Sequence, residues 1–188
     1  AKVLARYIDI IVYRTSSVDK LYELAKYSSI PVINGLNDET HPCQLIADIM
    51  TFEEKISIIT NKVVTWCGDF NNVCRSWVQA SSIFNFELHI ACPKQLISKN
   101  DMNKIGKIKN IKIFNEVENA CKNTDCISTD TWFSMGQKVS EKKRRLLKPF
   151  QVNNKLLSLT KKNSIFLHCL PAHRGEEIDE NILEHPKS

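Results

Sequence analysis

The stretch KVVTWCGDFNN, residues 62–72, decides the fold class of this chain. Its first half is an apolar, β-branched run of the kind that forms a buried strand, and its second half is a glycine turn. A helical pattern follows the turn, because Val73, Trp77 and Phe84 recur at helical spacing. A strand that passes through a glycine turn into a helix is the repeating unit of α/β folds.

The same alternation of short apolar segments and helical segments continues on both sides of this stretch. It predicts an α/β fold with a largely parallel, doubly wound sheet. The expected strands are Ile8 to Tyr13, Pro31 to Asn34, Lys62 to Cys67, Glu87 to Cys92, Lys112 to Asn115, Asp125 to Thr129 and Ser164 to His168.

Toward the amino terminus, residues 42–58 are expected to form a helix that bridges two domains. Leu45, Ile49 and Phe52 fall at helical spacing, and Pro42 suits the first helical position. The segment before this helix holds too few predicted strands and helices for an independent α/β domain. We therefore expect residues 1–46 to be the carboxyl-terminal remnant of one domain, and residues 47–188 to form a second domain that is incomplete at its carboxyl end.

Polar clusters follow three of the expected strands, at residues 68–72, 130–137 and 168–171. In an open parallel sheet, ligands bind in the crevice outside the carboxyl ends of the strands. Residues that are distant in sequence are therefore expected to meet in one pocket. The turn at Gly68 resembles half of a dinucleotide site, but the G-x-G-x-x-G spacing is absent and Phe70 stands where a second glycine is needed. No nicotinamide cofactor is expected.

Taken singly, several of these polar residues have ordinary structural explanations. Asn71 or Asn72 could cap the helix that follows, and Asp130 could be a turn residue. Cys169 could be a small core residue, as most buried cysteines are, and His168 a packed imidazole. Leu170-Pro171 is expected to turn the chain sharply and is a candidate cis peptide.

His41 and Gln44 are more informative, because a separation of three residues at a helix start puts both side chains on one face. A small ligand could contact both of them. The amino terminus of a helix also favours an anion such as a phosphate or a carboxylate. The alternative is that His41 is simply the N-cap.

The composition is that of an ordinary soluble globular protein, with 43% hydrophobic and 25% charged residues. No apolar run approaches the roughly 20 residues of a membrane-spanning helix, so no membrane partner is expected. The net charge is +5, and the densest basic run, residues 138–148, is interpreted as a solvated helix face with Leu146 and Leu147 turned inward. No nucleic-acid partner is expected. The seven cysteines lack zinc-site spacing, which favours reduced thiols in a cytosol-like compartment and no metal.

Four stretches together resemble the ornithine carbamoyltransferase family, in the family's order and spacing. They are HPCQLIAD from His41, WCGDFNNVCRSW from Trp66, TDTWFSMGQ from Thr129 and FLHCLPAHRGEEI from Phe166. The similarity covers nearly the whole chain and includes residues 12–36. It implies a carbamoyl-phosphate domain followed by an ornithine domain, assembled as homotrimers with active sites at subunit boundaries. Carbamoyl phosphate and L-ornithine would be the substrates, L-citrulline the product and arginine metabolism the setting, in the cytoplasm or the mitochondrial matrix.

By matching position, the resemblance implies that Arg14, His41 and Gln44 contact carbamoyl phosphate. Arg14 and His41 would polarise its carbonyl oxygen, and Gln44 would hold its amide. Cys169 and Leu170 would also line this part of the site, next to the reacting amine. No metal and no organic cofactor are implied.

On the other side of the implied site, Asn72, Asp130, Ser134 and Met135 would bind ornithine. Cys169 paired with Asp130 would help to bind and deprotonate its side-chain amine, a general acid/base role. Catalysis would thus rest on Cys169, Asp130, His41 and Arg14.

The sequence departs from the family pattern at both ends. The family's Ser-x-Arg-Thr-Arg loop, which grips the phosphate, does not occur in the 188 residues, and the final family segment is absent after Pro186. We therefore expect both ends to be truncated and the chain alone to form no appreciable citrulline. The alternatives are a shortened, non-catalytic ornithine-binding remnant, a carbamoyltransferase for another amine and, ranked far below, a basic nucleic-acid-binding protein.

Overall fold

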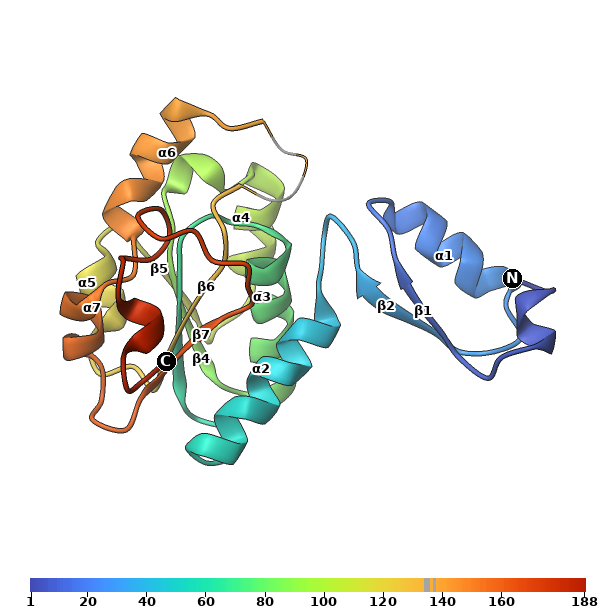
Figure 1. The fold of residues 1–188 in the computed structure, drawn as a ribbon, viewed down its shortest axis with the longest axis horizontal. Coiled ribbons are helices and arrows are strands. Elements are labelled where there is room, and N and C mark those ends of the chain that lie inside the picture. The colour runs from blue at the N-terminus through green and yellow to red at the C-terminus, as the bar shows by residue number, and fades with distance from the viewer. Residues whose placement is uncertain (134–135, 137) are drawn as a thin grey trace.

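The computed structural model describes every residue except 134, 135 and 137. Helix α2 (Pro42–Lys55) lies between a small N-terminal lobe, residues 1–41, and a larger sheet lobe, residues 56–188 (Figure 1). The helix predicted over residues 42–58 is present, although it is shorter than expected. It ends at Lys55 because the Glu53 carboxylate accepts a hydrogen bond from the Ile59 backbone and closes a turn.

The N-terminal lobe contains two parallel strands and one covering helix, which are β1 (Ile11–Arg14), α1 (Val18–Tyr27) and β2 (Val32–Leu36), after a short 3-10 turn. The hydroxyl of Ser17 caps α1 by accepting a hydrogen bond from the Lys20 backbone. Val12 and Ile33 lie opposite each other in the strand register, and both are exposed. This lobe therefore leaves an apolar sheet face open.

The sheet lobe is built on five parallel strands in the order β5-β4-β3-β6-β7. The predicted parallel, doubly wound α/β fold is confirmed. The strands are β3 (Val63–Cys67), β4 (Glu87–Ala91), β5 (Ile111–Phe114), β6 (Cys126–Thr129) and β7 (Ile165–His168). The helices are α3 (Asn72–Phe84), α4 (Lys99–Ile105), α5 (Val117–Cys121), α6 (Glu141–Leu147) and α7 (Asn154–Leu159).

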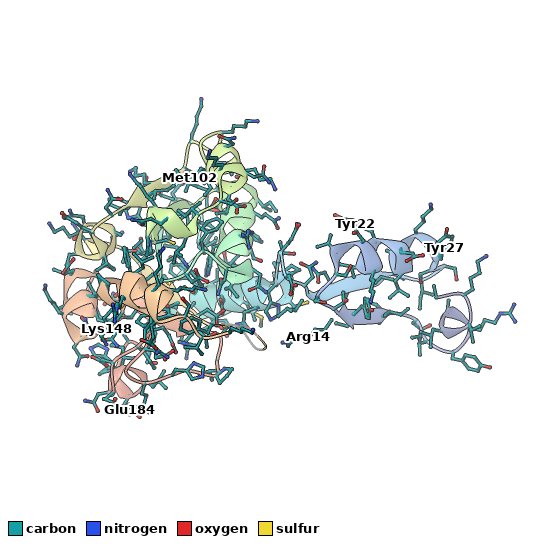
Figure 2. The ribbon with its side chains drawn as sticks, turned by 90° about the horizontal axis from the view of Figure 1, so that it is seen from above. Arg14, Tyr22, Tyr27, Met102, Lys148 and Glu184 are labelled. Carbon is teal, nitrogen blue, oxygen red and sulfur yellow. The ribbon has the colours of Figure 1, made fainter. Side chains whose placement is uncertain are left out.

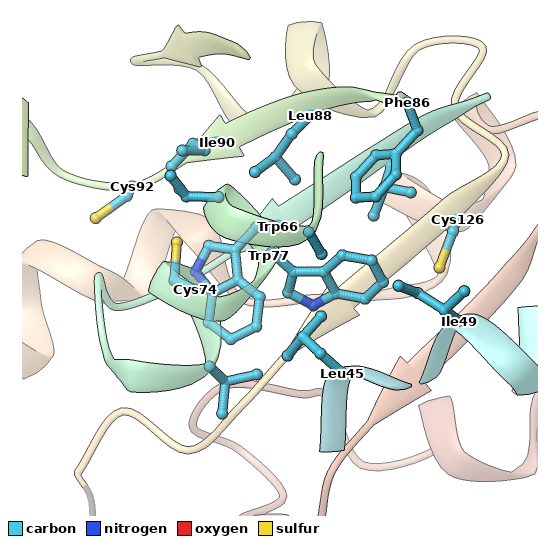
Figure 3. Close-up of a cluster of buried hydrophobic side chains, with 14 of the residues drawn as sticks. Leu45, Ile49, Trp66, Cys74, Trp77, Phe86, Leu88, Ile90, Cys92 and Cys126 are labelled. Carbon is cyan, nitrogen blue, oxygen red and sulfur yellow. The ribbon is translucent and has the colours of Figure 1, made fainter. Parts of the chain in front are cut away.

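Each face of the sheet packs against its own hydrophobic cluster, because successive strand side chains point to opposite faces. Val64 and Trp66 of β3 face a cluster that includes residues of α2, α3 and α4, with Trp77 in its middle (Figure 3). Cys67 and Ile127 belong to a second cluster with α5 and α7. Helices therefore cover both faces of the sheet. Within the described residues, no helix has the length and apolar character needed to cross a membrane.

The order of the strands reverses direction at β3, which has β4 and β5 on one side and β6 and β7 on the other. Such a switch point opens a crevice at the carboxyl ends of the strands, because the loops that leave the neighbouring strands run to opposite faces. The loops that follow β3 and β6 flank this crevice.

Candidate active site

The strand register places the three predicted polar clusters at one level of one sheet edge. Cys67, Thr129 and His168 end β3, β6 and β7, and they are register partners across the three neighbouring strands. The residues that follow them, among them Asp130 and Cys169, therefore emerge side by side. The expectation that these clusters converge is confirmed.

Asp130 is the centre of this edge and is only 8% exposed. One carboxylate oxygen accepts hydrogen bonds from the Cys169 thiol, at 2.9 Å, and from the Thr131 backbone, at 2.7 Å. The other oxygen accepts a hydrogen bond from the Asn71 amide at 2.7 Å. Asp130 thus accepts three hydrogen bonds at a buried position, and these bonds fix the direction of its carboxylate.

The Cys169 side chain is a protonated thiol that donates to Asp130. Burial raises the pKa of this thiol, and the neighbouring Asp130 carboxylate raises it further. After Cys169, the chain turns through the Leu170-Pro171 bond, which is cis as the sequence suggested. Leu170 adopts a left-handed backbone conformation, is 61% exposed, and donates its backbone N–H to the His168 ring.

Asn71, and not Asn72, is the side-chain cap of α3. Its carbonyl oxygen accepts hydrogen bonds from the backbones of Val73 and Cys74, while its amide reaches Asp130. Asn72 donates to the backbone carbonyl of Asn37 in the N-terminal lobe at 3.0 Å. The sequence did not single out the link from Asn71 to Asp130, since a cap assignment leaves the amide end of the side chain unspecified.

His41 and Gln44 lie three residues apart at the start of α2, and both are half-buried. His41 is the N-cap residue by backbone position, but its side chain makes no capping bond. Its backbone N–H donates to the Ser76 hydroxyl of α3 at 2.7 Å, which fixes the helix start to the sheet lobe. Burial lowers the pKa of the His41 imidazole, the Arg14 charge lowers it further, and Asp130 opposes both effects. His41 thus stands at the junction of the two lobes, since it ends the N-terminal lobe and its backbone is bonded to α3.

Arg14 is exposed at the carboxyl end of β1, where the pairing with β2 is irregular. Figure 2 shows it at the end of the N-terminal lobe that faces α2 and the sheet lobe. Of the residues that the resemblance assigned to carbamoyl phosphate, Arg14, His41 and Gln44 therefore belong to the N-terminal lobe and the start of α2. Cys169 and Leu170 directly follow β7 at the sheet edge. Ser134 and Met135, the other two residues assigned to ornithine, lie outside the described residues.

Asp48 also belongs to this region, and the sequence prediction missed it. It is 7% exposed on α2, and its carboxylate accepts a hydrogen bond from the Gln44 amide at 2.8 Å. Burial raises the pKa of Asp48 to about 6, against an opposing effect of the Gln44 bond, and the Asp130 charge adds to the rise. The available signal was the separation of four residues, which places Gln44 and Asp48 on one helix face.

His168 is held by a buried carboxylate. Its ring is 3.1 Å from Glu177, and the two side chains are 2% and 0% exposed. Ligand atoms of His173, Glu176 and Glu177 lie within 4.8 Å of one another, a spacing that a metal ion could bridge. Glu176, however, already accepts hydrogen bonds from Arg144, and Glu177 from the His173 backbone. Through these contacts, Glu176 and Glu177 hold the loop that follows β7 in place.

The basic run forms α6 and lies against the loops of the sheet edge. Leu147 is buried beneath it, as expected, whereas Leu146 is only half-buried. Lys143 makes an ion pair with Asp69 at 2.6 Å, and both Lys143 and Arg144 lie over the Phe133 ring. Part of the positive charge is thus neutralised within the chain.

Comparison with known proteins gives two family matches that together cover most of the chain. Residues 1–54 match the family described as "Aspartate/ornithine carbamoyltransferase, carbamoyl-P binding domain". Residues 60–188 match the one described as "Aspartate/ornithine carbamoyltransferase, Asp/Orn binding domain".

Individual relatives agree with these matches. The ornithine carbamoyltransferase of Rhodopseudomonas palustris (strain BisA53) is 46% identical over 190 aligned residues, which cover 100% of this chain and 61% of the relative. The crystal structure of the Burkholderia thailandensis E264 ornithine carbamoyltransferase has a TM-score of 0.88 at 35% identity, covering 100% of this chain and 61% of that one. The Pyrococcus furiosus enzyme has a TM-score of 0.88 at 38% identity, with coverages of 98% and 61%. The chain thus spans about three fifths of the length of these relatives.

Proposed function

The chain belongs to the aspartate/ornithine carbamoyltransferase family, and we propose that it is part of an enzyme that converts carbamoyl phosphate and L-ornithine into L-citrulline and phosphate. The observation that carries the proposal is the buried Asp130–Cys169 pair at the switch point of the sheet. We further propose a role in arginine metabolism, a homotrimeric assembly and a cytoplasmic location, with the mitochondrial matrix as the alternative compartment.

Arg14, His41 and Gln44 form the carbamoyl-phosphate side of the proposed site. Because burial and the Arg14 charge lower the pKa of His41, its ring is neutral near pH 7 and can donate one N–H to the carbonyl oxygen. Arg14 supplies a permanent positive charge beside it. Together they stabilise the negative charge that develops on this oxygen as the amine attacks.

Asp130 and Cys169 form the amine side of the proposed site, with Leu170 beside them. The δ-nitrogen of ornithine bonds to the carbamoyl carbon, the bond from that carbon to the phosphate oxygen breaks, and the nitrogen gives up a proton. Since the raised pKa of Cys169 keeps its thiol protonated, Asp130 is the better proton acceptor of the pair. The thiol then orients the carboxylate by donating to it.

Asn72, Ser134 and Met135 are proposed to hold the amino-acid end of ornithine. For Asn72 this role has a structural consequence, because its amide now donates to the Asn37 backbone. Ornithine must either share this amide or replace the contact. Binding of ornithine would then alter a link between the sheet lobe and the segment that leads to the N-terminal lobe.

The decisive experiment measures citrulline formation by the product of the reading frame that encodes this chain. We expect turnover with carbamoyl phosphate and ornithine, and a loss of kcat of about 100-fold or more in Asp130→Asn, the range for removing a positioned base. Asp9→Asn, a change at an exposed carboxylate of the N-terminal lobe, is the matched control and should leave turnover unchanged. An active Asp130→Asn variant would overturn the assignment of the base, and an inactive parent protein would overturn the proposed reaction.

A second candidate is an ornithine-binding module without catalysis. It is favoured by the position of the Asp130–Cys169 pair, which lies wholly within the sheet lobe. Calorimetry with ornithine and with carbamoyl phosphate, on the 188-residue chain, separates the two candidates. The second candidate is supported if the 188-residue chain binds ornithine and neither this chain nor the product of its reading frame forms citrulline.

A further inference from the structure

Asp48 has no role in the function proposed so far, although it contacts one of the residues involved. It lies on α2 one turn after Gln44, and its carboxylate accepts a hydrogen bond from the Gln44 side-chain nitrogen at 2.8 Å. Asp48 is 7% exposed, whereas Gln44 is half-buried at the side of the helix that leads to His41. The contact thus runs from a buried charge to a side chain that a ligand can reach.

This contact gives the Gln44 amide a direction. A glutamine side chain carries a donor end and an acceptor end, whereas an ionised carboxylate can only accept. The carboxylate of Asp48 therefore selects the rotamer in which the nitrogen faces Asp48 and the carbonyl oxygen faces away from it. Turning the amide over would place two acceptors against each other, which is costly at a buried position.

The substrate of the proposed reaction needs this direction. The carbamoyl group ends in an NH2 group, which is a donor and has to meet an acceptor. We propose that Asp48 is a positioning residue that holds the carbonyl oxygen of Gln44 toward the carbamoyl NH2. This inference rests on the proposed function, since it assumes that Gln44 binds carbamoyl phosphate, and it adds a residue that acts through Gln44 without touching the substrate.

The surroundings of Asp48 make the arrangement sensitive to protonation. Asp130 lies near enough to oppose the ionisation of Asp48, and His168 near enough to favour it. The nearby thiols of Cys126 and Cys169 stay protonated because burial raises their pKa values. A protonated Asp48 can donate to the Gln44 carbonyl oxygen, so that the amide no longer has a preferred direction.

The first test follows the Gln44 side chain directly by NMR, in the 15N-labelled 188-residue chain. Its NH2 resonances are identified by their loss in Gln44→Glu, with Gln79→Glu, an exposed change on α3, as the control for the assignment. We expect these resonances to titrate between pH 5 and 7 in the parent chain and to lose the titration in Asp48→Asn. A titration that persists in Asp48→Asn, or one that is absent from the parent chain, overturns the coupling.

The second test is kinetic and uses the product of the reading frame that encodes the chain. Asp48→Asn should raise the KM for carbamoyl phosphate about tenfold, the effect of one misdirected hydrogen bond, and leave the KM for ornithine unchanged. Glu54→Gln, an exposed change on the same helix, should alter neither constant. In a Gln44→Ala background, Asp48→Asn should have no further effect on the KM for carbamoyl phosphate, because the two residues act as a unit.

The outcomes separate the inference from the function on which it rests. An active parent whose Asp48→Asn variant keeps its KM for carbamoyl phosphate overturns the role of Asp48 and leaves the proposed function intact. A parent that forms no citrulline overturns the proposed function, and the inferred role with it. An Asp48→Asn effect that persists in the Gln44→Ala background shows a structural role for Asp48 and also overturns the inference.

Discussion

The two lobes of this chain differ in how much core supports the residues that they contribute to the site. In the sheet lobe, Trp66, Trp77 and Trp132 are at most 1% exposed, whereas Tyr7 and Tyr22 of the N-terminal lobe are 81% and 70% exposed. A lobe that buries so little apolar surface cannot offset the loss of chain entropy by itself. The amine side of the proposed site is therefore firmly held, and Arg14, at the end of β1, is held much less firmly.

Among the residues that the structure describes, two hydrogen bonds join α3 to the segment before α2. Asn72 donates to the Asn37 carbonyl, and the His41 backbone donates to the Ser76 hydroxyl. Both contacts end on the first turns of α3. The N-terminal lobe thus depends on the sheet lobe for its position. We therefore predict that a substitution in the core of the sheet lobe destabilises the whole chain, whereas a substitution in the N-terminal lobe destabilises that lobe alone.

The largest effect is expected from Trp77→Ala in the sheet lobe. Trp77 is fully buried, packs edge-on against Phe86 and donates its ring N–H to Ser128. Its removal should lower the free energy of unfolding by about 3–5 kcal/mol. Urea unfolding followed by the fluorescence of the remaining tryptophans measures this change.

Val12→Ala is the matched control for this prediction, because it truncates an apolar side chain that is 63% exposed in the N-terminal lobe. It should change the free energy of unfolding by no more than about 0.5 kcal/mol. Equal losses in the two variants would show that the small lobe has a core comparable to that of the sheet lobe, and the contrast between them would be wrong.

A somewhat smaller effect, dependent on pH, is expected at Asp48 on the helix between the lobes. Burial raises the pKa of Asp48 from 3.8 to about 6 in the folded chain, so the folded state binds a proton more tightly than the unfolded state between these values. The contribution of Asp48 to stability is therefore complete below pH 3.8 and is lost as the pH rises to 6. Two pKa units correspond to about 3 kcal/mol.

Urea unfolding of the parent and Asp48→Asn at several pH values between 4 and 7 isolates this contribution. The free energy of unfolding should fall by about 3 kcal/mol more in the parent than in the variant over this range. Other carboxylates also titrate here, and the pKa of Asp69 is raised while that of Asp101 is lowered, but the comparison with the variant cancels them. Parallel pH profiles would mean that Asp48 is better solvated than its burial indicates.

The strands and helices of the sheet lobe could be predicted from the sequence, whereas the side-chain contacts of the candidate site could not. The periods of the apolar residues fix where strands and helices occur, and parallel α/β order follows from their alternation, so the edge that carries Asp130 and Cys169 could be expected. Which end of an amide faces which neighbour depends on packing in three dimensions. For this reason the contact of Asn71 with Asp130 had no clear trace in the sequence, and the helical spacing of Gln44 and Asp48 allowed their contact without specifying it.

The resemblance also assigned residues whose contacts the structure makes more specific. Asn72 was expected to bind ornithine, and in the structure its amide contacts the Asn37 backbone across the two lobes. Sequence spacing could not reveal that contact, because Asn37 and Asn72 are 35 residues apart and belong to different lobes. The roles of Arg14, His41 and Cys169 stay predictions until the variants are measured.

Asp130→Asn tests whether the sheet edge is built around a charge. The asparagine must turn its NH2 group toward the amide of Asn71 or toward the Cys169 thiol and the Thr131 backbone, so that donors face each other. We expect a loss of about 1–3 kcal/mol in the free energy of unfolding, the cost of an unsatisfied buried group. Calorimetry should show in parallel that the variant no longer binds ornithine; unchanged stability with lost binding would assign Asp130 to the ligand alone.

The smallest effect is expected from Ser17→Ala, and it tests the independence of the N-terminal lobe. The Ser17 hydroxyl caps α1, and its removal should destabilise this helix by about 1 kcal/mol. Since α1 buries none of its residues, this loss should speed amide hydrogen exchange in residues 18–27 and leave the urea unfolding of the sheet lobe unchanged. The equivalent change at the other lobe, Asn71→Ala at the start of α3, removes a cap that also holds Asp130 and should shift the global transition. If Ser17→Ala shifts that transition as much as Asn71→Ala does, the two lobes unfold as one cooperative unit, and Arg14 is held as firmly as Asp130.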